Sequence, residues 1–225
     1  MPQKAPRIAG VYLAAGSSLR MGKPKLSIRT GIGERPLGTI ALQAAVRSRL
    51  DDLTIVTRER HSTIWAALDE HVRGESGRIR FADVDAGEAA KGLSRSIQAG
   101  LAAATSRKTA DAVVILLADQ PLVTAGMIDK LIEAFASDPS LQYAAYFNGE
   151  ALSPPLLISS RLFGSLLGLE GDKGARELLR QPGLRGIAIL PEKPELLLDI
   201  DTEQDLRKLD DYWINHGKEG EDEAT

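Results

Sequence analysis

The sequence contains no cysteine, which excludes disulfide bonds, thiolate nucleophiles and cysteine-ligated metal sites. Its three histidines, His61, His71 and His216, are far apart, and His61 and His71 lack the spacing of a metal-ligand pair, so we expect no histidine-based metal site. Aromatic residues make up only 4% of the 225 residues. A core built mainly of Ala, Leu, Ile and Val suits a buried parallel sheet better than an antiparallel sandwich.

Long apolar segments and a strong charge of one sign are also missing. No stretch approaches the length of a membrane-spanning helix, and the first residues lack the apolar segment of a signal peptide, so we expect a cytoplasmic protein. The formal net charge is −3, from 28 basic and 31 acidic residues. This balance predicts neither a nucleic-acid partner nor an anionic membrane surface.

Apolar runs alternate with helical patterns along the chain. We predict strands at Ile8–Ala14, Leu53–Thr57, Ile79–Val84, Ala112–Ala118, Gln142–Phe147, Pro155–Ser159, Gly186–Leu190 and Leu196–Ile200, and helices at Thr39–Arg49, Ser62–His71, Ser94–Ala104 and Thr124–Ser137. Strand and helix repeated four times favour an α/β fold: a single-domain, doubly wound, mostly parallel sheet with helices on both faces.

The second half of the sequence is less regular. Ser153-Pro154-Pro155 opens a strand that lacks two amide donors, which predicts an edge strand or a bend. Short helices are expected at Arg161–Leu167 and Lys173–Arg180, and a final helix at Thr202, where Asp205 completes a capping-box-like pair. We assign residues 1–215 to one domain and residues 216–225 to a flexible acidic tail.

In open α/β sheets, ligands bind beyond the carboxyl ends of the strands. The positions to inspect are therefore Ala14–Lys25, Thr57 and Arg58, Asp83–Gly92, Asp119–Pro121, and Asp201.

The segment from Leu13 to Lys25 has the composition of a polyphosphate site. Small residues, Ala14-Ala15-Gly16-Ser17-Ser18, allow backbone amides to approach phosphate oxygens, and three cations, Arg20, Lys23 and Lys25, follow. Pro24 follows Gly22-Lys23 where a Walker A loop requires Ser or Thr, and Ser17 stands at that motif's first glycine. The dinucleotide pattern Gly-x-Gly-x-x-Gly does not occur after this strand either.

Two carboxylates follow predicted strands. Asp119 ends a fully apolar strand and could hold Mg²⁺, which needs few protein carboxylates beside phosphate oxygens and water; alternatively, it caps the following turn. Asp201 could reach the same ion or cap the last helix. Asp199 would share the face of Asp201 on a strand, further back, and is the weaker candidate.

A third segment, Gly92-Leu93-Ser94-Arg95-Ser96, opens a predicted helix. Either Ser94 or its neighbour serves only as the N-cap, or the turn contacts a ligand.

These segments together resemble the MobA-like nucleotidyltransferases. Leu13–Gly22 with Lys25 is similar to their signature, and Gly171-Asp172-Lys173-Gly174-Ala175-Arg176 is similar to an element of the molybdenum-cofactor cytidylyltransferases. The resemblance implies a Rossmann-like nucleotidyltransferase fold, with the nucleotide at Leu13, Ala14, Ala15, Gly16, Ser17, Ser18, Lys25, Gly92, Ser94 and Ser96. It implies Lys25, Arg20 and Asp119 as catalytic residues, Lys23 at the periphery, and Mg²⁺ held by Asp119 and Asp201.

The activity implied is transfer of CMP from CTP to the phosphate of molybdopterin, with release of pyrophosphate, in support of a xanthine-dehydrogenase-type hydroxylase. Ala14-Ala15 favours cytidine, where guanylyl-transferring relatives carry Ala-Gly. The family's Gly-His-Pro is replaced here by Ser153-Pro154-Pro155, and its Asn-led loop by Asp85-Ala86-Gly87, which leaves the acceptor open. Guanylyl transfer, transfer to a sugar phosphate or methylerythritol phosphate, and a non-enzymatic carrier of the finished cofactor remain alternatives.

Overall fold

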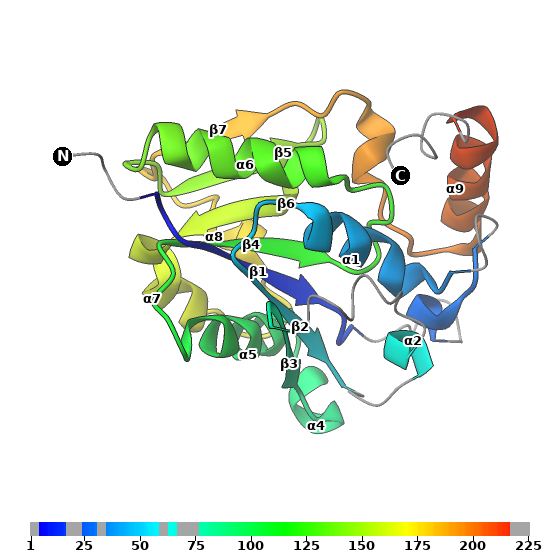
Figure 1. Cartoon of the computed structure of the whole chain (residues 1–225), viewed down its shortest axis with the longest axis horizontal. Coiled ribbons are helices and arrows are strands. Elements are labelled where there is room, and N and C mark those ends of the chain that lie inside the picture. The colour runs from blue at the N-terminus through cyan, green and yellow to red at the C-terminus, as the bar shows by residue number, and fades with distance from the viewer. Residues whose placement is uncertain (1–4, 17–23, 31–34, 59–62, 67–76, 217–225) are drawn as a thin grey trace.

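A computed structural model describes residues 5–16, 24–30, 35–58, 63–66 and 77–216. Its centre is a seven-stranded sheet with the order β3-β2-β1-β4-β6-β5-β7 (Figure 1). The strands are β1 (Ile8–Leu13), β2 (Asp52–Thr57), β3 (Ile79–Asp83), β4 (Ala112–Leu117), β5 (Tyr143–Phe147), β6 (Leu152–Ser159) and β7 (Gly186–Ile189). Only β6 runs antiparallel to its neighbours, which confirms the predicted doubly wound, mostly parallel sheet.

Helices cover both faces of the sheet, as predicted (Figure 1). One face carries α1 (Leu37–Arg47) and α6 (Ala125–Ser137), and the other carries α5 (Leu93–Thr105), α7 (Phe163–Leu167) and α8 (Ala175–Leu178). The six residues of β1 are all buried because the strand lies in the middle of this sandwich. This burial explains why the early strands read as continuous apolar runs.

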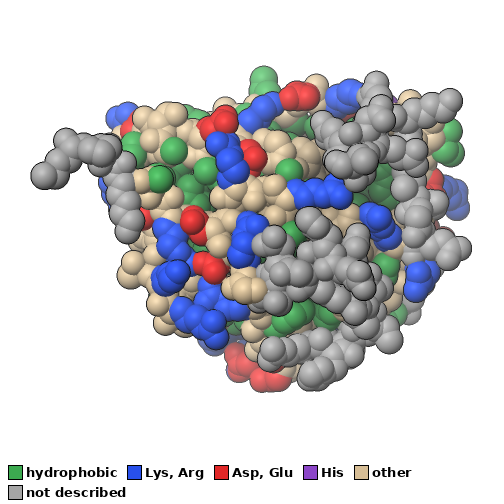
Figure 2. All heavy atoms as spheres, viewed as in Figure 1, with side chains coloured by type: hydrophobic (Ala, Val, Ile, Leu, Met, Phe, Trp, Pro, Cys, Tyr) green, Lys and Arg blue, Asp and Glu red, His purple; other side chains and the backbone are tan. Residues whose placement is uncertain are grey.

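The remaining elements are short or peripheral. They are α2 (Thr63–Ala66), α4 (Ala86–Ala89), the 3-10 helices Lys25–Ser27, Ser160–Leu162 and Pro194–Leu197, and the last helix, α9 (Glu203–His216). Within the described part of the chain, no helix is long and apolar enough to cross a membrane. On the exposed part of the face in Figure 2, basic and acidic side chains are interspersed, in keeping with the small net charge.

The predicted Leu196–Ile200 strand is wrong. Residues Pro194–Leu197 form a 3-10 helix, and the chain that follows makes a single backbone hydrogen bond to the neighbouring segment, from Ile200 N to Asp119 O at 2.9 Å. Pro194 starts that turn with a fixed backbone angle, and one hydrogen bond does not make a ladder.

The prediction of an edge position for the strand at Ser153–Pro155 is also wrong. β6 lies between β4 and β5, although two of its residues are prolines. The ladder between β4 and β6 ends at Leu156, and the pairing of β5 with β6 jumps from Leu156 to Ser153. Both prolines therefore lie in an irregularity of the sheet, where no ladder hydrogen bond requires their missing N–H groups. The predicted bend is therefore present inside the sheet.

Several helix boundaries differ from those predicted. α8 spans four residues rather than the eight of Lys173–Arg180, and Arg161–Leu167 divides into a 3-10 turn and α7. Of the Ser62–His71 helix only Thr63–Ala66 is described, and residues 217–225 of the predicted tail lie outside the described residues.

Candidate active site

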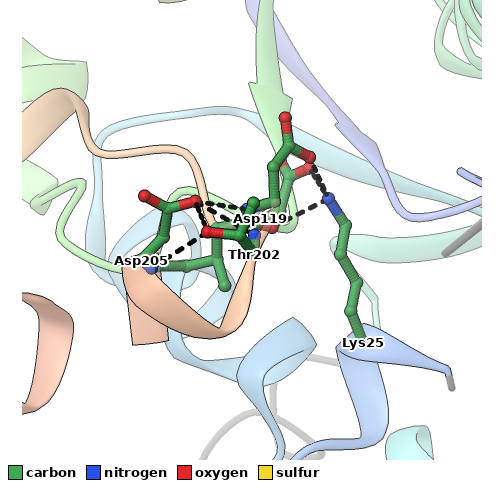
Figure 3. Close-up of polar contacts among 6 residues, drawn as sticks. Lys25, Asp119, Thr202 and Asp205 are labelled. Atoms are coloured by element: carbon green, nitrogen blue, oxygen red, sulfur yellow. Dashed lines mark hydrogen bonds and ion pairs between the residues drawn. The ribbon is translucent and has the colours of Figure 1, made fainter. Parts of the chain in front are cut away.

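The carboxyl ends of the central strands carry a cluster of opposite charges (Figure 3). Lys25 Nζ lies 2.7 Å from Asp119 Oδ2 and 2.9 Å from Asp201 Oδ1, and it also donates to the carbonyl oxygen of Ile200 at 2.9 Å. An ammonium has three N–H donors, so it can serve all three of these oxygens at once. The structure thus brings together three residues that are up to 176 positions apart in the sequence.

Each member of this cluster is positioned by the fold. Lys25 begins the 3-10 helix Lys25–Ser27, and Leu26 anchors that turn in the core. Asp119 follows β4, which lies beside β1, and Ala118 N donates to Leu13 O at 3.1 Å. The hydrogen bond from Ile200 N to Asp119 O then holds the third segment against the second.

Asp201 is oriented by the capping box of α9 (Figure 3). Asp205 N donates to Thr202 Oγ1 at 3.2 Å, and Asp205 Oδ2 accepts from Thr202 N at 3.0 Å. Asp205 Oδ2 also accepts from the backbone N of Asp201 at 3.3 Å. The predicted capping pair of Thr202 and Asp205 is confirmed, and Asp201 is not one of its two members.

The electrostatics of the cluster favour a bound cation. Burial lowers the pKa of Lys25, but the two carboxylates outweigh burial and raise it, so the ammonium stays charged. Burial, followed by the negative charges of Asp119 and Asp201, raises the pKa of Asp199 from 3.8 to about 6. Asp199 therefore adds a third acidic side chain beside Asp119 and Asp201, whereas Lys25 is the cation that contacts the two carboxylates. The excess of acidic groups favours a further cation at this site.

The oxygen donors of Asp119 and Asp201 fit Mg²⁺. Their side chains are 24% and 42% exposed, so both can be reached from solvent. The Lys25 ammonium contacts both carboxylates, as a metal ion shared by them would. The described residues contain no cluster of three or more potential metal-ligating side chains, so two carboxylates would require phosphate oxygens and water to complete the coordination, as is usual for Mg²⁺.

A cavity of about 650 Å³ opens beside this cluster. Its floor is apolar and comes from the sheet, through Ile115, Leu117 and Leu156. Its opposite wall is the segment between Glu170 and Arg180, which contributes the cations Lys173, Arg176 and Arg180 as well as acids. Its lining also includes Asp119 and Asp201, as well as Asp199, Ser153 and Pro154.

The predicted phosphate loop is described only at its two ends. Leu13, Ala14 and Ala15 are buried, Ala14 N donates to Val56 O at 2.8 Å, and Gly16 is exposed. Arg58 Nη2, which follows β2, donates to Gly16 O at 3.1 Å. Ser17, Ser18, Arg20 and Lys23 lie outside the described residues.

The turn before α5 differs from its predicted form. Gly92 caps the helix in a left-handed conformation, with φ +109°, and neither serine caps it. Ser94 and Ser96 are buried, at 1% and 5% exposed. Their roles in nucleotide binding, like those of the first loop, stay predictions. Asp85, noted in the sequence as a departure from the family, caps α4 by accepting from Glu88 N.

Comparison with known proteins places this site in a family. The MobA-like NTP transferase domain matches residues 10–186 of the chain. The chain belongs to the MobA-like NTP transferase family. The predicted family and its Rossmann-like nucleotidyltransferase fold are confirmed.

Individual relatives agree with this assignment. The chain is 37% identical over 204 residues to the purine catabolism protein PucB of Bacillus subtilis, covering 90% of this chain and 95% of PucB. The homologue of Mycobacterium tuberculosis Rv0371c from Mycobacterium sp. strain JC1 superposes with a TM-score of 0.75 at 26% identity, covering 93% of this chain and 98% of the homologue. Rv0371c of M. tuberculosis H37Rv in complex with manganese superposes with a TM-score of 0.69 at 25% identity, covering 91% and 98%.

Sequence reasoning missed part of this MobA-like site. It assigned Lys25 to phosphate but not to the carboxylates that it contacts, because an ion pair between residues 94 positions apart leaves no local pattern. It also missed Gln98, whose side chain holds the carbonyls of Leu167 and Leu169. A single glutamine on an amphipathic helix gives no signal that could have found it.

Proposed function

We propose that this MobA-like protein transfers CMP from CTP to the phosphate of molybdopterin, with Mg²⁺, and releases pyrophosphate. The observation that carries the proposal is the contact of Lys25 with both Asp119 and Asp201, two residues that line the cavity. A lysine and two accessible carboxylates, gathered where β4 ends, are the groups that such a transfer requires. The manganese complex of Rv0371c supports a divalent ion in this family.

The proposed reaction requires no covalent bond between the protein and the substrates. An oxygen of the acceptor phosphate forms a bond to the α-phosphorus, and the bond from that phosphorus to the pyrophosphate oxygen breaks. Mg²⁺ on Asp119 and Asp201 would supply charge neutralisation and orientation of phosphate oxygens. Lys25, and Arg20 by its place in the sequence motif, stabilise charge on the α-phosphate and on the leaving pyrophosphate. Backbone amides of residues 15–18 hold the triphosphate, because the amide of Ala14 is already bonded to Val56 O.

The cavity supports a molybdopterin-like acceptor. Its volume of about 650 Å³ falls within the range of small-ligand sites. The apolar floor suits a flat ring system, and the cations of the opposite wall suit a phosphate. The name of PucB, together with the Gly171–Arg176 element, favours a place in purine catabolism and a xanthine-dehydrogenase-type hydroxylase as the recipient. Ala14 and Ala15 favour CTP over GTP.

A second candidate is transfer to another small phosphate, such as a sugar phosphate or methylerythritol phosphate. Pro154 favours it, because this residue lines the cavity where the family usually carries histidine. A cofactor carrier without activity is disfavoured, since a carrier has no use for Lys25 held against two carboxylates.

The test is pyrophosphate release with Mg²⁺, each of the four NTPs and each acceptor. We expect CTP with molybdopterin to give the highest rate. Lys25→Ala should lower that rate at least about 100-fold, since removal of such a charge costs about 3 kcal/mol in the barrier. The matched control, Lys91→Ala, removes a lysine from an exposed pair with Glu88 and should leave the rate unchanged. Product with non-pterin acceptors alone would replace the first candidate by the second.

A further inference from the structure

Two segments that are distant in the sequence are locked together beside the cavity. They are the first turns of α5 and the loop between α7 and α8. Ser94 N donates to Gly171 O at 3.1 Å, and a Cβ on Gly92 would lie 2.3 Å from the carbonyl carbon and oxygen of Gly171. A Cβ on Gly174 would likewise lie 2.9 Å from the Leu93 side chain. The two backbones therefore meet with no space for a side chain between them.

Gln98 closes the same contact one turn further along α5. Its Nε2 donates to the carbonyl oxygens of Leu167 and Leu169, each at 2.9 Å, so both amide hydrogens are used on the loop. Its Oε1 accepts from Arg95 Nη1 at 3.1 Å. Residues 94 and 98 are four positions apart and lie on the same face of the helix, so the side chain extends the line of contacts begun by Ser94 N.

The loop held in this way forms the cationic wall of the cavity. It begins after α7, reaches Gly171 and carries Lys173; Arg176 follows on the first turn of α8, and both cations line the cavity. Gly171 has φ +60°, and a Cβ there would meet nothing within 4 Å, so that side of the loop is open. Contacts with α5 thus hold the first part of the wall, up to Gly174, whereas α8 is also anchored by Ala175 and Leu178 in the core.

We propose that Gln98 is a positioning residue for the acceptor: by holding the carbonyls of Leu167 and Leu169, it sets the distance of Lys173 and Arg176 from the reacting phosphate. The inference rests on the proposed function, because it takes this cavity as the acceptor site. A displacement of about 1 Å in such a wall is enough to weaken a productive complex strongly. The triphosphate contacts assigned to residues 15–18 belong to another loop. Those assigned to Gly92, Ser94 and Ser96 lie at the start of α5, which is held against the sheet through its own core residues, such as Ile97 and Leu101.

The experiment compares Gln98→Met and Gln98→Glu with the wild type. Both substitutions remove the two N–H donors at nearly unchanged length, and Gln98→Glu keeps the oxygen that faces Arg95, so a shared effect reports the donors. Gln204→Met, at an exposed position of α9, is the matched control. The Michaelis constants for acceptor and for NTP, and kcat, are measured by pyrophosphate release. Hydrogen exchange of the amides from 167 to 176 is measured on the same proteins.

We expect both Gln98 variants to raise the Michaelis constant for the acceptor at least about tenfold, with the constant for NTP and kcat within about twofold. Two results would overturn the positioning role. One is Michaelis constants for acceptor and NTP that both equal those of the wild type, and the other is a similar rise in both constants together with a loss in kcat. If the wild type releases no pyrophosphate with any pair of NTP and acceptor, the proposed function fails. The hydrogen-exchange data then still test whether Gln98 holds the segment from 167 to 176. Faster exchange at 167–176 in both variants supports this contact, and unchanged exchange refutes it.

Discussion

Replacement of Lys25 by methionine should destabilise the metal-free protein and make it a better metal binder. Methionine keeps the apolar stem that is packed in the Lys25–Ser27 turn and removes the ammonium, with its contacts to Asp119, Asp201 and Ile200 O at 2.7, 2.9 and 2.9 Å. The loss leaves two carboxylates facing each other without their shared cation.

The size of the effect follows from burial. Removal of one partner of a fully buried ion pair costs about 3–5 kcal/mol, whereas exposed pairs contribute about 0–1 kcal/mol. The lysine side chain is 11% exposed, but the carboxylate side chains are 24% and 42% exposed, so solvent screens part of the interaction. We therefore expect the free energy of unfolding to fall by about 1–3 kcal/mol.

Urea unfolding in EDTA measures this loss, and a Mn²⁺ titration measures the gain in metal affinity. The affinity should rise at least about tenfold in Lys25→Met, since the metal no longer competes with the ammonium for the same oxygens. Lys91→Met is the control, because it removes an exposed cation paired with Glu88 and should change neither quantity measurably. Wild-type stability together with wild-type Mn²⁺ affinity in Lys25→Met would refute the reasoning.

Three further perturbations test other parts of the account. Because the folded pKa of Asp199 is about 6 against an ordinary 3.8, its contribution to stability is complete below pH 3.8 and is lost as the pH rises through 6; Asp199→Asn should remove that fall in metal-free urea unfolding, and an unchanged profile would contradict the pKa. Gly92→Ala should cost at least about 2 kcal/mol in the same assay, because it adds a clash with Gly171 to backbone strain, whereas Gly149→Ala, at φ +97° in open space, meets the strain alone; equal losses would argue against the contact. Thr202→Ala should lower stability by about 1 kcal/mol and weaken Mn²⁺ binding through Asp201, whereas Thr202→Ser should do neither; wild-type binding by the alanine variant would separate the cap from the site.

The parallel half of the fold could be predicted because its signals are local. The β4 run Ala112–Leu117 is apolar throughout since helices cover both faces, and α6 begins where the Thr124 hydroxyl accepts from Met127 N. Buried strands and capped helices therefore leave patterns within a few residues.

The antiparallel part could not be placed from the sequence, because its position depends on distant segments. Pro154 and Pro155 argue against an interior strand, and only the register of β5 shows that both fall in an irregularity. Leu196–Ile200 has the apolar content of a strand, but among the described residues its one backbone hydrogen bond to a distant segment is that from Ile200 N to Asp119 O.

The sequence identified which residues belong to the candidate site, but not which of them contact one another. The rule for carboxyl ends of strands located Lys25 and Asp119, whereas Asp201 was selected through a strand that the structure does not contain; the structure adds that the lysine holds both carboxylates. The contacts that shape the cavity wall, from Gln98 and from the Gly92 backbone, join residues about 70 to 80 positions apart and have no local signature.

The most direct test of the central claim is mass spectrometry of the product formed from CTP, molybdopterin and Mg²⁺, with pyrophosphate counted in the same reaction. We expect a CMP–molybdopterin adduct, one pyrophosphate for each adduct, and neither product from Asp119→Asn. Molybdopterin recovered unmodified, in a reaction where the protein binds both substrates, would contradict it.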